Sequence, residues 1–246
     1  MNVFLPLYLR ITKRRFNKIF QPLTPTKKPS HVISLPSTTK HFLQILPFLA
    51  GLKKSGSVLV LVPKTLEHIY KFVKSNVFET LFYEKPPQLF SQEYKSLKEK
   101  LEKRHFHCLI ELNTPPNLSL PYLISANKRI CYYGNNHFPY YNILIKNTIR
   151  PLIEFLGVEE ENPQQLFSFP SSGLKRVSKR IDRKQPLLFI NRKNDIQWNG
   201  TKIVVGLDIP PSNAETYQIL YLADAYYGEH DALYEFAKIF NKRIIE

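Results

Sequence analysis

After residue 30, short apolar runs alternate with longer stretches whose hydrophobic positions suit helices. Five runs are rich in apolar or β-branched residues and short enough to be strands buried on both faces: 32–35, 58–62, 80–83, 108–112 and 129–133. Helix-compatible segments separate the first four runs, at 39–54, 66–74 and 92–104. Strands joined by helical crossovers predict right-handed βαβ units, so residues 31 to about 135 are expected to form an open parallel sheet.

A second set of strands and helices follows a connecting region. Residues 139–161 are expected to be a connecting helical region, and residues 163–184 are polar and basic with little periodicity. Beyond them the pattern predicts strands at 186–190, 202–207 and 225–227 and helices at 213–223 and 231–240. The fold class is therefore α/β, with two Rossmann-like parallel-sheet domains facing a cleft and the second domain reduced. Ligands of such sheets bind at the carboxyl ends of their strands.

Three segments are expected: a basic amphipathic segment with a linker at 1–30, a first domain at 31–160, and a basic linker with the reduced domain at 161–246. The pattern of the first segment predicts a helix with an apolar and a basic side. The apolar side carries Tyr8, Ile11, Phe16, Ile19 and Phe20, and the basic side carries Arg10, Arg14 and Lys18. Such a helix either binds an anionic membrane surface through residues 1–28 or docks on its own domain.

The distribution of charge along the chain says more about its binding partners than the overall composition does. The chain has 246 residues, 43% of them hydrophobic, and its 35 Lys and Arg against 20 Asp and Glu give a formal charge of +15. The excess is concentrated in residues 1–30 and 171–200. A disordered tail is excluded, and no apolar run reaches the ~18 residues that a membrane span needs. Binding of nucleic acid through the two basic stretches is a weaker alternative.

The sequence contains few motifs that point to chemistry. Its eight glycines are too widely spaced for a phosphate-binding loop or a dinucleotide fingerprint, and its two cysteines form no disulfide framework. His105, His107 and Cys108 are clustered, but four ligands are needed for zinc and no second cluster supplies the rest. We therefore expect no metal and no cofactor. The location that fits is the cytoplasm, with the inner face of the cytoplasmic membrane as a peripheral binding surface.

Three runs resemble the heptosyltransferase-like glycosyltransferases, glycosyltransferase family nine, and they occur in that family's order. Residues 31–54, HVISLPSTTKHFLQILPFLAGLKK, are similar to the family's first strand, loop and helix. Residues 104–133, RHFHCLIELNTPPNLSLPYLISANKRICYY, are similar to a later strand, helix and strand. Residues 223–245, ADAYYGEHDALYEFAKIFNKRII, resemble the family's strand, loop and helix near the carboxyl terminus. The resemblance implies a GT-B fold and transfer of a sugar from a nucleotide-sugar donor.

Site residues follow from this resemblance position by position, and several depart from the family. The family's Gly-Asp pair after the first strand, which holds its base, falls on Lys40 and His41. A neutral imidazole can accept a proton near pH 7, so His41 is a candidate base, with a solvated helix start as the alternative. Glu111 ends a strand and either faces the cleft or caps the next helix.

The donor loop departs from the family more strongly. Its aligned residues include Gly228, Glu229, His230 and Asp231, of which only the glycine is kept, and Glu235 replaces a family histidine. Acids at a helix start repel a diphosphate. Three cations near strand ends could hold the donor instead: Arg192, Lys193 and Lys202.

Three functions are weighed on these grounds. The first is a glycosyltransferase that adds a sugar to a lipid-linked or cell-envelope acceptor. The second is a catalytically inactive protein of the same fold, a membrane-associated partner in envelope glycan assembly. The third is a nucleic-acid-binding protein. The order of the elements favours the first function. The shortness of the second domain, with about 60 residues after the basic linker, favours the second function.

Overall fold

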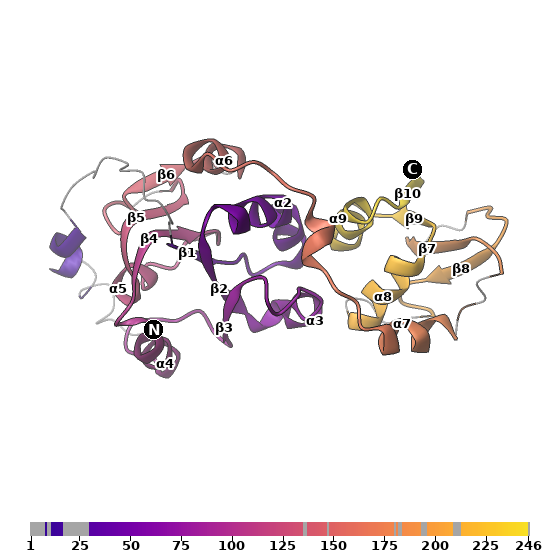
Figure 1. Cartoon of the computed structure of the whole chain (residues 1–246), viewed down its shortest axis with the longest axis horizontal. Helices are drawn as coiled ribbons and strands as arrows, with labels where there is room; N and C mark the ends of the chain where they lie inside the picture. The colour runs from indigo at the N-terminus through magenta and orange to yellow at the C-terminus, as the bar shows by residue number, and fades with distance from the viewer. Residues whose placement is uncertain are drawn as a thin grey trace. The chain divides into compact units, whose positions relative to one another are not determined.

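The chain folds as an α/β protein with two separate parallel sheets, as seen in a computed structural model (Figure 1). The structure describes residues 8, 11–16, 30–134, 137–146, 148–179, 181, 184–192, 196–208 and 213–245. Two compact units divide the chain. The first contains Met1–Ser37, Gly51–Lys64 and Phe78–Glu160, and the second contains Thr38–Ala50, Thr65–Val77 and Glu161–Glu246.

The first unit is built on a six-stranded sheet in the order β3-β2-β1-β4-β5-β6, with every neighbouring pair parallel. The strands are β1 (Ser30–Ser34), β2 (Ser57–Pro63), β3 (Glu79–Tyr83), β4 (His105–Glu111), β5 (Ser125–Tyr132) and β6 (Ile143–Ile145). Val32, Leu59 and Leu109 are at most 2% exposed, because central parallel strands are covered on both faces. The strand order reverses between β1 and β4, and the carboxyl ends of these two strands form the topological switch point of a Rossmann-type sheet.

Helices of several lengths precede, join or follow these strands along the chain. They are η1 (Lys13–Phe16), α2 (Thr39–Ser55), η2 (Lys64–Leu66), α3 (Glu67–Tyr70), α4 (Gln92–Leu101), α5 (Leu120–Leu123) and α6 (Arg150–Leu156). Helix α4 begins where the Ser91 hydroxyl accepts a hydrogen bond from the Tyr94 backbone N–H. Helix α6 ends at Gly157, whose φ of 61° is the left-handed conformation that glycine adopts at low cost.

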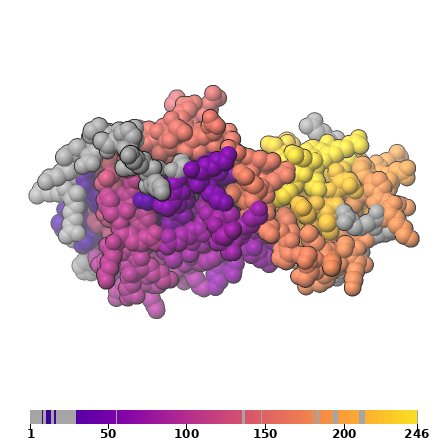
Figure 2. All heavy atoms as spheres, viewed as in Figure 1, coloured from indigo at the N-terminus to yellow at the C-terminus, as the bar shows by residue number. Residues whose placement is uncertain are grey.

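The second unit is built on a four-stranded parallel sheet in the order β10-β9-β7-β8. Its strands are β7 (Leu187–Asn191), β8 (Thr201–Val204), β9 (Ala225–Gly228) and β10 (Arg243–Ile245), and its helices are η3 (Pro163–Leu166), α7 (Ser171–Ser178), α8 (Ala214–Leu222) and α9 (Ala232–Ile239). Aromatic rings pack in this unit: Phe169 stacks on Tyr221 of α8 with ring centroids 4.3 Å apart, and Phe236 of α9 lies 4.6 Å from Phe240 at the end of the same helix. Figure 2 shows residues from about 165 to 200 in orange packed against the yellow residues near the carboxyl terminus.

The predicted fold class is confirmed and a strand lies at each of the eight predicted positions, while three local predictions are wrong and one strand was missed. The region 139–161 is helical only in α6 and contains strand β6. The strand predicted at 202–207 ends at Val204, because Gly206 takes a φ of 88° and starts a turn. Strand β10 was not predicted. Helix α7 lies in the stretch expected to be irregular, and Val177 is its one buried residue among those described.

Candidate functional site

A pocket lies at the carboxyl ends of β7 and β9 in the second unit. Its volume is about 470 Å³, and it is lined by Arg192, Gly228, Glu229, His230, Ile244 and Ile245. Asn191 pairs directly with Gly228 across the two strands. A Cβ at Gly228 would lie 2.8 Å from the Asn191 backbone oxygen, so a glycine is needed there. The structure thus brings together four of the residues that the sequence assigns to donor binding.

Asp231 occupies the start of helix α9 beside this pocket. Its Oδ1 accepts hydrogen bonds from the backbone N–H groups of Leu233, at 2.8 Å, and Tyr234, at 3.2 Å. Its Oδ2 accepts a 2.8 Å hydrogen bond from Asn191 Nδ2. Two backbone donors that a phosphate could use at a helix start are therefore bound to this carboxylate. Sequence reasoning missed Asn191, whose position at the end of β7 was the available signal.

The cation of the pocket is Arg192, the first residue after β7. It is exposed, and its guanidinium carbon lies 5.7 Å from the centroid of the Tyr227 ring. A guanidinium over an aromatic face is held in place while its N–H donors still point outward. Arg192 can therefore donate to a phosphate or carboxylate in this pocket.

Of the two other predicted cations, Lys202 does not join it. Lys202 pairs with Leu188, so it lies four residues before the level of Arg192, a separation of roughly 13 Å along the strands. The expectation that Lys202 lies near the strand ends that could hold the donor is therefore wrong. Lys193 is outside the described residues.

His41 lies on the first turn of α2, exposed to solvent. Its neighbour Lys40 donates a 2.6 Å hydrogen bond from Nζ to the backbone oxygen of His230. One turn further along α2, Gln44 Nε2 donates a 3.0 Å hydrogen bond to Glu235. The start of α2 is thus tied to the loop that lines the pocket. His230 itself stacks on Tyr234, with ring centroids 4.1 Å apart.

Glu111 lies at the switch point of the first sheet and is fully buried. Its Oε1 accepts hydrogen bonds from the backbone N–H of Asn113 at 2.9 Å and from Asn113 Nδ2 at 2.7 Å. Its Oε2 has no hydrogen-bond partner among the described residues. Burial raises the pKa of Glu111 to about 7, although the hydrogen bonds from Asn113 act in the opposite direction. The carboxyl anchors the loop after β4 rather than a helix start.

A basic cluster lies at His31, His107 and Lys128 in the first unit. Lys128 Nζ is 3.2 Å from His107 Nε2, and the two histidine rings are 6.4 Å apart. Burial, followed by the charges of His107 and Lys128, lowers the pKa of His31 to about 4. Cys108 and Cys131 are buried free thiols. Within the described residues, no group of three or more His, Cys, Asp or Glu side chains is arranged to hold a metal ion.

The described part of the amino-terminal segment packs on the first unit. Tyr8 lies 5.0 Å from Phe90 between ring centroids, and Phe16 lies 4.8 Å from Tyr122. Ile11 is 64% exposed. These contacts use two of the five residues assigned to the apolar side of the predicted amphipathic helix. The other positions of that helix, Arg10, Lys18, Ile19 and Phe20 among them, are outside the described residues, and in the part that is described no helix has the length and apolarity to cross a membrane.

Comparison with known structures identifies the fold. The chain is similar to the glycosyl transferase family 9 protein from Veillonella parvula DSM 2008, with a TM-score of 0.67 and 10% identity over 91% of this chain and 82% of that one. It is similar to the E. coli ADP-heptose LPS heptosyltransferase II, with a TM-score of 0.60 and 9% identity over 87% of this chain and 83% of that one. For E. coli heptosyltransferase WaaC with ADP-2-deoxy-2-fluoro heptose, the TM-score is 0.51 and the identity 10%, over 87% of each chain.

No protein-family model and no curated protein sequence matches the chain. At about 10% identity, the structural similarity establishes the fold but not the activity. The activity has to be argued from the residues of the site. The resemblance of the three sequence runs to glycosyltransferase family nine is thereby confirmed as a likeness of fold. The chain has a reduced GT-B-like fold of two Rossmann-like parallel sheets.

Proposed function

We propose that this protein is a glycosyltransferase of the heptosyltransferase type, which transfers a sugar from a nucleotide-sugar donor to a cell-envelope acceptor. The observation that carries the proposal is the pocket at the carboxyl ends of β7 and β9, where open α/β sheets bind ligands. Its volume of about 470 Å³ is within the range of small-molecule sites. The similar E. coli proteins are named for ADP-heptose and heptosyl transfer, which supports a nucleotide-sugar as the donor.

Arg192 and His41 have separate roles in this proposal. The Arg192 guanidinium donates to the donor's diphosphate and stabilises the charge that develops on the leaving group. His41 Nδ1 or Nε2 accepts the proton of the acceptor hydroxyl, whose oxygen attacks the anomeric carbon. The bond from that carbon to the diphosphate oxygen breaks, and the nucleoside diphosphate leaves. Gly228 allows the close approach of the strand ends that shapes the pocket.

Asp231 favours a second candidate function, a catalytically inactive protein of the same fold that assists envelope glycan assembly. Its carboxylate already accepts the N–H groups of Leu233 and Tyr234. A diphosphate would therefore have to displace a bound negative charge before it could use the helix start. The two candidates differ in one measurable property, the binding of a nucleoside diphosphate.

Isothermal titration of the full chain with ADP, UDP, GDP and CDP tests both candidates. For the transferase, one nucleotide binds, and Arg192→Gln weakens that binding by about tenfold or more, because hydrogen bonds to charged groups are strong. The matched control is Arg150→Gln, an exposed arginine of α6, which should bind as the unmodified protein does. No binding of any of the four nucleotides refutes the transferase and supports the inactive protein.

Asp231→Asn sharpens this experiment. Asparagine caps a helix nearly as well as aspartate, so the fold is preserved while the negative charge is removed. The transferase predicts tighter nucleotide binding by this variant. Unchanged binding would mean that the diphosphate does not approach the start of α9.

A further inference from the structure

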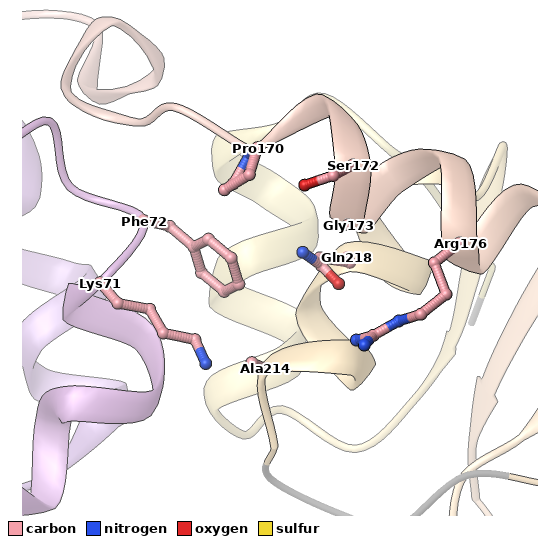
Figure 3. A pocket seen from close by; sticks show the side chains of 8 residues that line it. All are labelled: Lys71, Phe72, Pro170, Ser172, Gly173, Arg176, Ala214 and Gln218. Atoms are coloured by element: carbon pink, nitrogen blue, oxygen red, sulfur yellow. The ribbon is translucent and has the colours of Figure 1, made fainter.

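The second unit contains another cavity, with a volume of about 570 Å³, on helices α7 and α8 and the segment that follows α3 (Figure 3). None of its described lining residues lines the pocket at Arg192. Its volume is that of a small-molecule site, and its lining combines an aromatic ring with charged and polar groups. The residues that matter are Lys71, Phe72, Ser172, Gly173, Arg176 and Gln218.

Gln218 is the first observation that points to a ligand. Only 6% of the residue is exposed, and it is one of the residues that line the cavity. Figure 3 shows this carboxamide among the lining side chains, facing the Phe72 side of the cavity. The amide thus presents a donor and an acceptor at the wall of the cavity.

Gly173 makes room for that amide. A Cβ on Gly173 would lie 2.3 Å from Gln218 Nε2, well inside van der Waals contact. Glycine is unfavourable inside a helix by roughly 1 kcal/mol relative to alanine, so its presence in α7 needs a reason. A side chain at position 173 would push the Gln218 amide out of its place in the cavity wall.

Two cations give the cavity its charge. Lys71 and Arg176 come from different elements, and Figure 3 shows both side chains extending toward Ala214, the first residue of α8. The described lining residues include no carboxylate. The Ser172 hydroxyl adds a further donor, and the Phe72 ring forms an apolar wall. Two cations on separate elements suit a dianion better than a single negative charge.

We propose that this cavity binds a phosphorylated small molecule of sugar size. Lys71 and Arg176 hold the phosphate, while Ser172 and Gln218 bind hydroxyl groups and the Phe72 ring packs on the carbon skeleton. This site is distinct from the nucleotide pocket of the proposed function, and neither depends on the other.

Isothermal titration of the full chain with glucose 6-phosphate, glucose and glucuronate tests the proposal. Glucose 6-phosphate binds with saturation, and Arg176→Gln and Lys71→Gln each weaken this binding by about tenfold or more. The matched control is Lys175→Gln, an exposed neighbour on α7 that does not line the cavity and leaves binding unchanged. Equal binding of glucose 6-phosphate by Arg176→Gln and the unmodified protein overturns the proposal, as does tighter binding of glucuronate or no saturable binding.

Gln218→Leu separates loss of binding from loss of folding. Leucine is close to glutamine in size, so the variant should fold with a midpoint of thermal unfolding near that of the unmodified protein. Glucose 6-phosphate should nevertheless bind more weakly, by about threefold to tenfold. Full binding by a folded Gln218→Leu variant contradicts the role of the amide. Arg192→Gln must leave the affinity for glucose 6-phosphate unchanged, which keeps this test independent of the nucleotide titration.

Discussion

Replacement of Glu111 by glutamine should change how the stability of the protein depends on pH. The carboxyl is fully buried and its pKa is raised to about 7, against an ordinary value of 4.5. Between these two pH values the folded state binds the proton and the unfolded state does not, so the free energy of unfolding falls as pH rises. The full difference corresponds to about 3 kcal/mol.

The expected result is a difference between two measurements. Urea unfolding of the unmodified protein and of Glu111→Gln, each at pH 5 and pH 8, gives the free energy of unfolding in water. From pH 5 to pH 8, the unmodified protein should lose roughly 2 to 3 kcal/mol more stability than the variant, because only the unmodified protein must ionise a buried carboxyl. The comparison holds whatever the substitution itself costs, since that cost is the same at both pH values.

Glu79→Gln provides a control of opposite sign. A hydrogen bond from Arg104 holds the pKa of Glu79 below its ordinary value, so ionisation of Glu79 stabilises the folded state. That contribution is present above the ordinary carboxyl pKa and is lost as the pH falls through the pKa of Glu79 in the folded protein.

An equal loss of stability in the unmodified protein and in Glu111→Gln between pH 5 and pH 8 would refute the reasoning for Glu111.

Two glycine substitutions test steric and conformational effects separately. Gly51→Ala should destabilise the protein by about 1 to 3 kcal/mol in urea unfolding, because the new Cβ would lie 1.8 Å from the Glu159 backbone oxygen. Unchanged stability would mean that the backbone at Glu159 moves away without cost. Gly157→Ala has open space around it but keeps a φ of 61°, so we expect a loss of about 1 kcal/mol, and a gain in stability would show that the turn is not left-handed.

The sequence predicts the sheets better than their connections. Buried parallel strands are continuous apolar runs, as in β2 and β7, and that pattern can be read without knowledge of their neighbours. Strands β6 and β10 have three residues each, and their apolar runs are too short to distinguish from a loop. Helix α7 was missed because its polar and glycine residues conceal a narrow buried side that only its packing on α8 makes evident.

Part of the site could likewise be predicted, and part could not. Ligands of open α/β sheets bind at the carboxyl ends of the strands, and this rule predicts that Arg192 and Gly228 lie together, as they do. Arg192 directly follows β7, and Gly228 is the last residue of β9. The position of Lys202 depends on strand register, which the sequence of a short strand does not specify. The cavity at Gln218 depends on residues 71, 176 and 218, which are far apart in the chain and share no motif.

The short outer strands of the second sheet bear on how the protein behaves at high concentration. An outermost strand offers unpaired backbone groups to other copies of the chain, and a long flat one invites fibrous association. Here the outermost strands are β8, with four residues including Lys202, and β10, with three residues including Arg243. The short length and the positive charge of both strands discourage edge-to-edge pairing, so these two strands lower the tendency of the small sheet to aggregate.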